Sequence, residues 1–351
     1  MRPRPLTATE LVDRLAAPEP ADQLATPLDR VIVVDLDATE RYRRSCVDAA
    51  GGAADTAGGD GAAAALATLP AVVVGTSKRR DPPPRLPGAA LVDLVVAPGG
   101  PELDAVLATV DANPQASTAL ALVLRGGGVR SLADGLQLES AVYGTLQAGP
   151  EFARWRASRP VKTSRPAEKG PAVLVDRSGD ALDVVLNRPS VRNALDARMR
   201  DDLVAALAVA AHDPSIAQVH LHGAGPAFCA GGDLDEFGTR PDPATAHLVR
   251  MTRSPARTLA GLAERVVAHL HGACMGSGIE LPAFAARIVG RPDTVIALPE
   301  VRLGLIPGAG GTVSLPRRIG RHRTARLALT GHHIDAPTAH AWGLIDEIEA
   351  P

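Results

Sequence analysis

The chain contains few aromatic residues and very little lysine. Phe, Trp and Tyr make up 2% of its 351 residues, so the hydrophobic core has to be built mostly from Ala, Val and Leu. Lysine occurs only at Lys78, Lys162 and Lys169, and arginine supplies nearly all of the positive charge. The formal net charge is −2, which gives no sign of a nucleic-acid or membrane partner. Apolar residues still make up 46% of the chain, enough for a sizeable core.

Cysteine is also scarce. Cys46, Cys229 and Cys274 are scattered and form no Cys-x-x-Cys pair, which argues against a disulfide framework or a zinc knuckle. No apolar run approaches the roughly 18 residues of a membrane span. The first residues also lack the apolar run of a signal peptide. We therefore expect a cytoplasmic protein.

The first half of the chain is predicted to be an α/β segment that ends in helices. Short apolar runs at residues 30–36, 71–75 and 91–97 predict buried strands. The helices are predicted over residues 102–125, with a break where proline follows Asn113, and over residues 131–156 as one long amphipathic helix.

A polar, proline-rich segment divides the chain. Residues 161–171 contain prolines and two of the three lysines, and they predict a linker. We therefore expect two domains, over residues 1–160 and 172–351.

The second half alternates strands with helices. This alternation predicts an α/β domain with mainly parallel strands. The predicted strands cover residues 172–176, 181–187, 217–222, 265–270 and 293–298, and the helices cover residues 196–211 and 256–264 or begin near Gly278, Gly310 and Ala336.

Two glutamates lie twenty residues apart in glycine-punctuated segments. Glu280 lies in residues 271–281 (HGACMGSGIEL), and Glu300 lies in residues 298–312 (LPEVRLGLIPGAGGT). Two carboxylates that face one small space can divide a proton transfer, because one stays ionised and polarises a water while the other keeps a proton to donate. Adding water across an activated double bond requires this division.

Two glycine-rich turns offer backbone donors. Gly231 and Gly232 follow a strand, and glycine lets a ligand approach the backbone N–H groups closely. Gly276, Ser277 and Gly278 precede a predicted helix, whose first N–H groups have no partner inside the helix. Two such N–H groups that converge on one point form an oxyanion hole.

The histidines give only weak signals. His220 and His222 alternate on a predicted strand and face one side, but two histidines do not make a metal site. His332 and His333 have no acidic ligand pattern beside them. We therefore expect no metal.

Four segments resemble the motifs of the crotonase (enoyl-CoA hydratase/isomerase) superfamily. They occur in the order and spacing of that family, and the resemblance covers residues 172–349, about half of the chain. It implies a crotonase-like ββα spiral. The segments are residues 187–195 (NRPSVRNAL), residues 227–234 (AFCAGGDL), and the two glutamate segments given above.

The resemblance also implies roles for individual residues. The backbone N–H groups of Gly232 and Ser277 would form the oxyanion hole for a thioester enolate. Glu280 would activate the water, and Glu300 would give a proton to the α-carbon. The family usually has glycine where Ser277 stands, but serine keeps the N–H group.

The same resemblance implies an acyl-CoA substrate. The coenzyme A would contact Arg192, Ala194, Ala230 and Gly231, although a solvated arginine at a helix start explains Arg192 equally well. No cofactor beyond the coenzyme A of the substrate is implied, and the assembly would be a trimer or a hexamer.

The order of the segments differs from the family pattern. Crotonase domains usually continue with further helices past the segment that resembles residues 343–347, whereas this chain ends at Pro351. Residues 102–159 resemble those missing helices, and the strands before them resemble eroded crotonase strands. We therefore predict a degenerate crotonase-like half that supplies a replacement tail. An unrelated helical hairpin is the alternative.

These observations favour an enoyl-CoA hydratase-type lyase that acts in fatty acid metabolism. The presence of both glutamates favours hydration, because isomerases of the family typically keep one. The alternatives are a crotonase isomerase, a thioester hydrolase, or a non-catalytic acyl-CoA-binding subunit.

Overall fold

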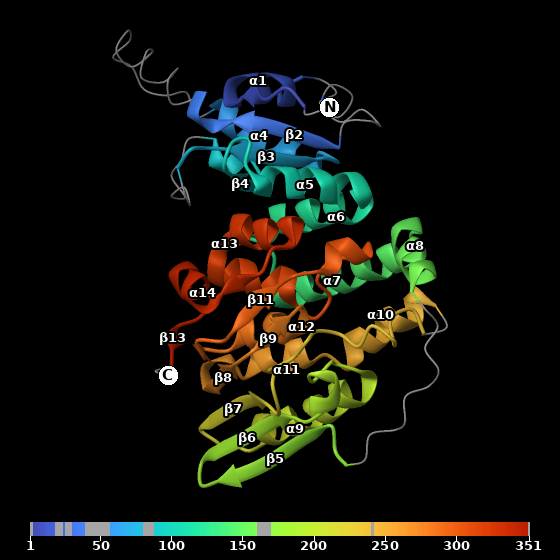
Figure 1. The fold of residues 1–351 in the computed structure, drawn as a ribbon, viewed down its shortest axis with the longest axis vertical. Coiled ribbons are helices and arrows are strands. Elements are labelled where there is room, and N and C mark those ends of the chain that lie inside the picture. The colour runs from blue at the N-terminus through green and yellow to red at the C-terminus, as the bar shows by residue number, and fades with distance from the viewer. Residues whose placement is uncertain are drawn as a thin grey trace. The chain divides into compact units, whose positions relative to one another are not determined.

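The computed structural model describes residues 3–17, 24, 30–38, 57–79, 88–159, 170–239 and 242–349 (Figure 1). The chain forms two compact units. The first comprises Met1–Val129 and Arg321–Thr330, and the second comprises Arg130–Gly320 and Gly331–Pro351. This division falls before the boundary predicted at residue 160, so the helices at 132–158 belong to the second unit. Residues 161–169 of the predicted linker lie outside the described residues.

The first unit contains a parallel four-stranded sheet with the order β1-β2-β3-β4. Its strands are β1 (Leu6–Thr7), β2 (Val31–Asp35), β3 (Val72–Thr76) and β4 (Leu94–Val96). The three predicted strands are therefore confirmed, because each is a run of valine, isoleucine or leucine buried in the sheet. Strand β1 has only two residues, too few for a pattern to identify.

The described helices of the first unit include α1 (Ala8–Leu15), α4 (Ala57–Thr68), α5 (Pro101–Ala112), α6 (Pro114–Arg125) and the short 3₁₀ helix η1 (Ala89–Leu91). The helical residues Arg321–Thr330 also belong to this unit. The predicted break at Asn113 is confirmed, because Pro114 begins a new helix. Thr7 caps α1 with its side chain, and Glu10 bonds back to the N–H group of Thr7.

A buried ion pair ties a helix of the first unit to its sheet. Arg125 donates to both carboxylate oxygens of Asp93, at 2.7 and 2.6 Å. The side chains are only 3% and 2% exposed. Arg125 also donates to the carbonyls of Leu66 in α4 and of Leu69 and Ala71 just before β3. Asp93 accepts the N–H group of Val73. Every charge in this buried group therefore has a partner.

We expect Asp93→Ala to lower the free energy of unfolding of the first unit by about 3–5 kcal/mol, because it leaves the Arg125 charge buried without its counter-ion. Urea denaturation followed by circular dichroism measures this change. The exposed Asp111 on α5 provides the control, and Asp111→Ala should change stability by no more than about 0.5 kcal/mol. Equal effects of the two substitutions would contradict the prediction.

The second unit is built on a six-stranded sheet with the order β13-β10-β8-β7-β6-β5. Only β5 and β6 pair antiparallel, as the predicted hairpin, and the other neighbours are parallel. The strands are β5 (Val173–Ser178), β6 (Ala181–Leu186), β7 (Gln218–Gly223), β8 (Val266–Leu270), β10 (Arg287–Gly290) and β13 (Glu347–Ile348).

A second, three-stranded sheet has the order β12-β11-β9. Its strands are β9 (Ala273–Met275), β11 (Val295–Ala297) and β12 (Ile334–Asp335). Strands β9 and β11 run parallel and carry the segments that lead to the two glutamates. Strands β9, β10, β12 and β13 were not among the predicted strands, and each has four residues or fewer.

Helices and 3₁₀ turns connect these strands. They are α9 (Ala197–His212), α10 (Pro243–Thr252), α11 (Pro255–Gly261), α12 (Ser277–Glu280), α14 (Ala336–Trp342), η2 (Pro189–Val191), η3 (Ala263–Arg265), η4 (Pro282–Phe284) and η5 (Glu300–Leu303). Helix α13 (Gly311–Thr330) contains Gly320 with φ 79° and ψ 157°, so it consists of two helices, and the unit boundary falls there. Among the described residues, no helix is both long and apolar enough to cross a membrane.

The single helix predicted over residues 131–156 is wrong. The structure has two helices there, α7 (Leu132–Gln147) and α8 (Pro150–Ser158). Gly149 is extended between them, and Pro150 has no N–H group with which to continue α7. Ser131 caps α7 through its hydroxyl. Helix α7 packs on α10, within the second unit.

Candidate active site

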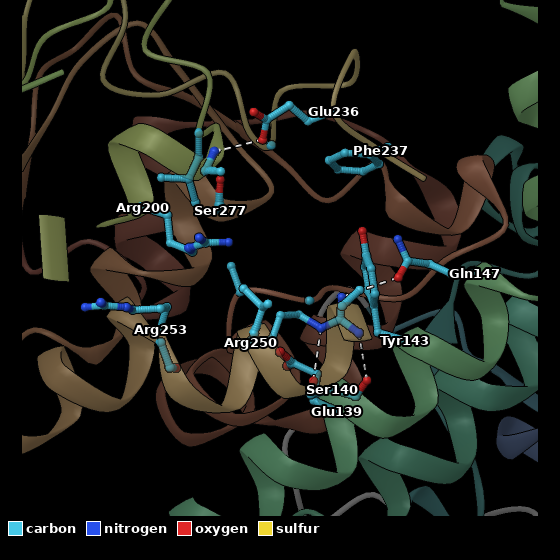
Figure 2. A pocket seen from close by; sticks show the side chains of 18 of the residues that line it. Glu139, Ser140, Tyr143, Gln147, Arg200, Glu236, Phe237, Arg250, Arg253 and Ser277 are labelled. Carbon is cyan, nitrogen blue, oxygen red and sulfur yellow. Dashed lines mark hydrogen bonds between the residues drawn. The ribbon is translucent and has the colours of Figure 1, made fainter. Parts of the chain in front are cut away.

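A cavity of about 550 Å³ opens in the second unit. The two glutamates singled out in the sequence, Glu280 and Glu300, both line it, and so do Gly232 and Ser277. A third acid, Glu139 of α7, also lines it (Figure 2). The structure therefore brings the four predicted site residues to one cavity, although up to 68 positions separate them in the chain. It also brings α7, which precedes all four, to the same cavity.

Glu280 ends the short helix α12 and is almost fully buried. Its Oε2 atom accepts the backbone N–H groups of Ala309 and Gly311, at 2.7 and 2.9 Å. The residue that precedes α12, Gly276, has φ +50° and ψ −118°, a conformation that favours glycine. The loop that follows Glu300 thus fixes the carboxylate of Glu280.

Glu300 begins η5 and is 8% exposed. Gly276 lies between the two carboxylates. A Cβ atom there would collide with Oε1 of Glu300 and would lie 3.7 Å from Oε1 of Glu280. The two acids therefore face the same small space. Within the described structure, Oε2 of Glu300 is buried and has no hydrogen-bond partner.

Glu139 was missed in the sequence analysis. Its Oε1 accepts the N–H group of Gly310 at 2.6 Å, and its Oε2 accepts the N–H group and hydroxyl of Thr312 at 2.8 and 2.7 Å. Glu139 and Glu280 thus bind alternate N–H groups of residues 309–312. Nothing local marks Glu139, because a glutamate in an amphipathic helix is ordinary and the loop it binds lies 171 residues away.

The three acids have raised pKa values. Burial raises the pKa of Glu300 to about 8, and the charge of Glu139 adds to this. Burial also raises the pKa of Glu139 to about 7, against the hydrogen bonds from Thr312 and Gly310. Burial and the charges of Glu300 and Glu139 raise the pKa of Glu280, and the two N–H groups bound to it oppose this shift.

The pair of Glu280 and Glu300 can hold one proton between them at neutral pH, because two buried carboxylates at close range repel each other when both are charged. Donated hydrogen bonds favour the charged form of an acid. Glu280 receives two of them, whereas Oε2 of Glu300 has no partner among the described residues. Burial and the charge of Glu300 favour the proton on Glu280, but the two donated hydrogen bonds favour the ionised form of Glu280, and on this geometry we assign the shared proton to Glu300.

Gly232 and Ser277, whose N–H groups were predicted as donors, both line the cavity. Among the hydrogen bonds of the described residues, neither N–H group serves as a donor. Ser277 is the first residue of α12, so its N–H group is one of those that a helix leaves without an internal partner.

Asn193, in the motif of residues 187–195, holds the segment that leads to Gly232. It is fully buried and has φ +56°. Its Nδ2 atom donates to the carbonyls of Ala224, Ala227 and Phe228, at 2.8, 2.9 and 3.1 Å. Its Oδ1 atom accepts the N–H group of Arg188 at 2.8 Å. The asparagine thus positions the segment that leads to Gly232.

The four residues predicted to contact coenzyme A do not line this cavity. Arg192, Ala194, Ala230 and Gly231 lie close to one another, since the N–H group of Ala230 donates to the carbonyl of Arg192. Leu195, which follows Ala194, donates its N–H group to the carbonyl of Gly231, and it does line the cavity. The predicted role of the four residues stays a prediction.

Arginines that the sequence analysis did not single out line the cavity. They are Arg156, Arg200, Arg250, Arg253 and Arg257. Figure 2 shows Arg200 and Arg253 across the cavity from Tyr143. No local pattern sets these arginines apart in a chain where arginine supplies nearly all positive charge.

Arg250 is held by α7. Its guanidinium donates to the hydroxyl and carbonyl of Ser140 and to Oε1 of Gln147, and its Cζ atom lies 4.7 Å from the centre of the Tyr143 ring (Figure 2). Helix α7 therefore contributes both an acid and an arginine anchor to the cavity.

The two buried cysteines serve packing. Burial raises the pKa of Cys229 to about 11 and raises that of Cys274 as well. Neither thiol would ionise near neutral pH, so neither is a nucleophile there.

Comparison with known proteins places the site in a family. Residues 177–351 match the family model described as enoyl-CoA hydratase/isomerase. The chain is 36% identical to YngF of Bacillus subtilis, whose name assigns it to the enoyl-CoA hydratases and isomerases, over 48% of this chain and 65% of that protein. It is 34% identical to 2,3-dehydroadipyl-CoA hydratase of Escherichia coli, over 50% of this chain and 68% of the relative.

The chain is also 34% identical to 1,2-epoxyphenylacetyl-CoA isomerase of Escherichia coli, over 48% of this chain and 65% of that protein. The chain thus spans about two thirds of the length of the curated relatives it matches. The match to the family model begins at residue 177 and does not include residues 1–160. The predicted likeness of residues 1–160 to a degenerate crotonase half therefore stays a prediction.

The residues matched by the family model, 177–351, include the four motifs and both glutamates. The chain therefore belongs to the enoyl-CoA hydratase/isomerase family, the crotonase superfamily.

Proposed function

We propose that the protein is an enoyl-CoA hydratase-type lyase, which adds water reversibly across the double bond of a 2-enoyl-CoA thioester. The observation that carries this proposal is the pair of buried glutamates that face one small space beside Gly276. Membership of the family supports an acyl-CoA substrate. The cavity of about 550 Å³ has room for an acyl chain.

In the proposed reaction the thioester carbonyl accepts hydrogen bonds from the N–H groups of Gly232 and Ser277. Ionised Glu280 takes a proton from a water as its oxygen bonds to C3 of the substrate. Electrons of the C2–C3 double bond move onto the carbonyl oxygen, and the two amides stabilise the resulting enolate. Protonated Glu300 then donates its proton to C2, which completes the addition of one water.

The arginines that line the cavity supply the positive charge that the phosphates of coenzyme A require. We propose that Arg200 and Arg253 bind them, together with the predicted contacts at Arg192, Ala194, Ala230 and Gly231. The reaction uses no other cofactor. We also propose the trimer or hexamer that the resemblance implied, which light scattering would measure.

The decisive experiment is an assay of the purified full chain against a panel of 2-enoyl-CoA thioesters of increasing chain length. We expect the enoyl absorbance to fall and a 3-hydroxyacyl-CoA to form, as identified by mass spectrometry. A chain that binds acyl-CoA but turns over none of the panel would support the binding-subunit alternative.

Double-bond isomerisation is a second candidate, because the family model that matches the chain is described as enoyl-CoA hydratase/isomerase. Isomerisation moves a proton and consumes no water. Panels of 2-enoyl-CoA and 3-enoyl-CoA thioesters in ¹⁸O-labelled water separate the two reactions. Hydration places the label in the product of the 2-enoyl panel, whereas isomerisation converts the 3-enoyl panel without taking up the label.

The hydration rate should depend on pH through Glu300. Its proton is needed for catalysis and its pKa is raised to about 8, so kcat/KM should be high at pH 7 and fall roughly tenfold per pH unit well above pH 8. A pH–rate profile on one enoyl-CoA measures this. A rate that stayed flat to pH 10 would contradict the assignment of Glu300 as the proton donor.

A further inference from the structure

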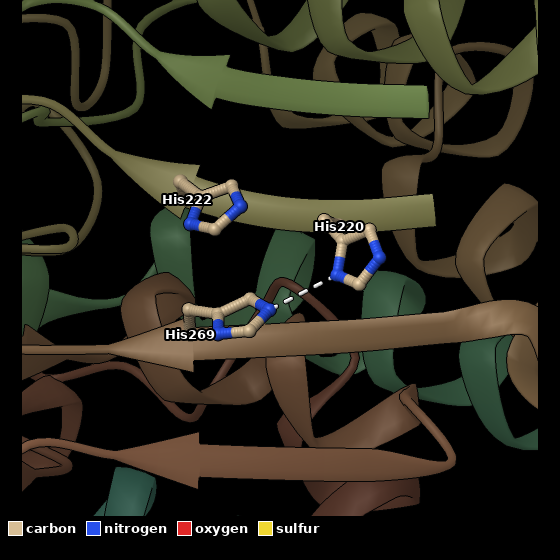
Figure 3. Close-up of side chains that lie close together, drawn as sticks. All are labelled: His220, His222 and His269. Carbon is tan, nitrogen blue, oxygen red and sulfur yellow. Dashed lines mark hydrogen bonds between the residues drawn. The ribbon is translucent and has the colours of Figure 1, made fainter. Parts of the chain in front are cut away.

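Three histidines meet on one face of the large sheet of the second unit, away from the cavity. His220 and His222 lie on β7, and His269 lies on the neighbouring strand β8 (Figure 3). One ring nitrogen of each lies within 4.8 Å of one ring nitrogen of each of the others. None of the three lines the catalytic cavity.

The strand alternation explains why the three side chains share this face. Val219 and Leu221 of β7 are buried in the core, so His220 and His222 point to the opposite side. On β8 the buried residues are Val266, Ala268 and Leu270, which turns His269 to the same side. All three histidines are half-buried and reachable from solvent.

The spacing of two of the nitrogens suits a shared metal ion. Nδ1 of His220 and Nε2 of His269 lie 3.1 Å apart. Zinc binds imidazole nitrogen at about 2.0–2.1 Å in tetrahedral geometry, which separates two such ligands by about 3.3 Å. The ring of His222 stacks on that of His269, with centroids 4.4 Å apart. The His222 side chain has to turn out of this stack to become the third ligand.

A side-chain oxygen lies near the second ring nitrogen of each histidine. Nδ1 of His269 lies 3.9 Å from a carboxylate oxygen of Glu349, and Nε2 of His220 lies 3.2 Å from Oε1 of Gln218. Nε2 of His222 lies 3.3 Å from a carboxylate oxygen of Asp183. Histidines that bind metal usually donate their second ring N–H to such an oxygen, which fixes the tautomer and orients the ring.

We propose that His220, His222 and His269 form a binding site for one divalent transition-metal ion of the zinc class. The ligand nitrogens are Nδ1 of His220 and of His222 and Nε2 of His269, and a water takes the fourth position. Imidazole ligands favour Zn²⁺, Ni²⁺ and Cu²⁺ over Mg²⁺ and Ca²⁺, which prefer oxygen. The ion would join β7 to β8 on the open face of the sheet.

The test is zinc binding to the chelator-treated full chain, measured by competition with a chromophoric chelator. We expect one zinc ion per chain with a Kd below about 1 μM. His269→Ala should weaken binding by at least about 100-fold, and Asp183→Asn, which changes only an outer partner, by about tenfold. His332→Ala/His333→Ala removes two exposed histidines elsewhere and should leave the affinity unchanged.

A spectrum of the unmodified protein covers the case in which a variant does not fold. Co²⁺ in the site should give the intense visible bands of a tetrahedral ion, and His222→Ala should lose them. The proposal is overturned if the unmodified chain binds no zinc with a Kd below about 10 μM. It is equally overturned if a folded His269→Ala variant, checked by circular dichroism, binds zinc as tightly as the unmodified chain does.

Discussion

Glu300→Gln should lower kcat/KM for enoyl-CoA hydration by about 10²–10⁴-fold, the contribution that a positioned proton donor typically makes. The glutamine keeps the shape of the side chain but holds no acidic proton for C2. The fold should be unchanged, because Oε2 of Glu300 has no hydrogen-bond partner within the described structure. Stability should change little at neutral pH, since protonated Glu300 is already neutral and the amide replaces one buried neutral group with another.

Glu280→Gln should lower the rate by a similar factor for a different reason. Its amide nitrogen cannot take a proton from water, and it can also present N–H groups to Ala309 and Gly311, which are donors themselves. Kinetic assays on one proven substrate measure both variants, and equilibrium binding of a saturated acyl-CoA checks that the cavity remains intact.

The matched control for both variants is Glu236→Gln. Glu236 lines the same cavity but is exposed, and its carboxylate accepts the N–H group of Ala197 at 2.8 Å. This variant should keep most of its turnover. If Glu280→Gln or Glu300→Gln also kept most of its turnover, the two-glutamate mechanism would be wrong.

The second large effect concerns Glu139, which acts as a positioning residue. Glu139→Gln should lower kcat by about 100-fold, because residues 309–312 would lose an acceptor and Glu280 would move with them. A misplacement of about 1 Å can cost that much. The glutamine has one acceptor oxygen for the three donors that Glu139 now accepts.

If Glu139 had a purely structural role, Glu139→Gln would not change the pH at which kcat/KM falls. The charge of Glu139 helps to raise the pKa of Glu300. Without that charge Glu300 loses its proton at lower pH, so the fall in kcat/KM at high pH should begin below pH 8. Thr312→Val removes one donor but keeps the carboxylate. It also raises the pKa of Glu139, so it should slow the reaction and move this limb less than Glu139→Gln does. A Glu139→Gln profile that fell at the same pH as the unmodified enzyme would rule out the electrostatic part of the role.

The sequence by itself determined the parts of the fold and site that are local. The short apolar runs of β2, β3 and β4 predict buried strands without knowledge of their neighbours. Pro114 likewise predicts a helix boundary from the chemistry of proline alone. The four motifs carried the resemblance to the family, and that resemblance pointed to Glu280, Glu300, Gly232 and Ser277, all of which line the cavity.

Only the tertiary structure decided which distant groups meet. Glu139 reaches residues 309–312 because α7 packs in the second unit, and a glutamate in a helix carries no mark of the loop that it will bind. His269 joins His220 and His222 because β8 pairs with β7, and strand pairing does not follow from a pattern inside one strand. The unit boundary at Val129 has the same origin, because compactness depends on contacts between segments, whereas a proline-rich stretch records only local backbone preference.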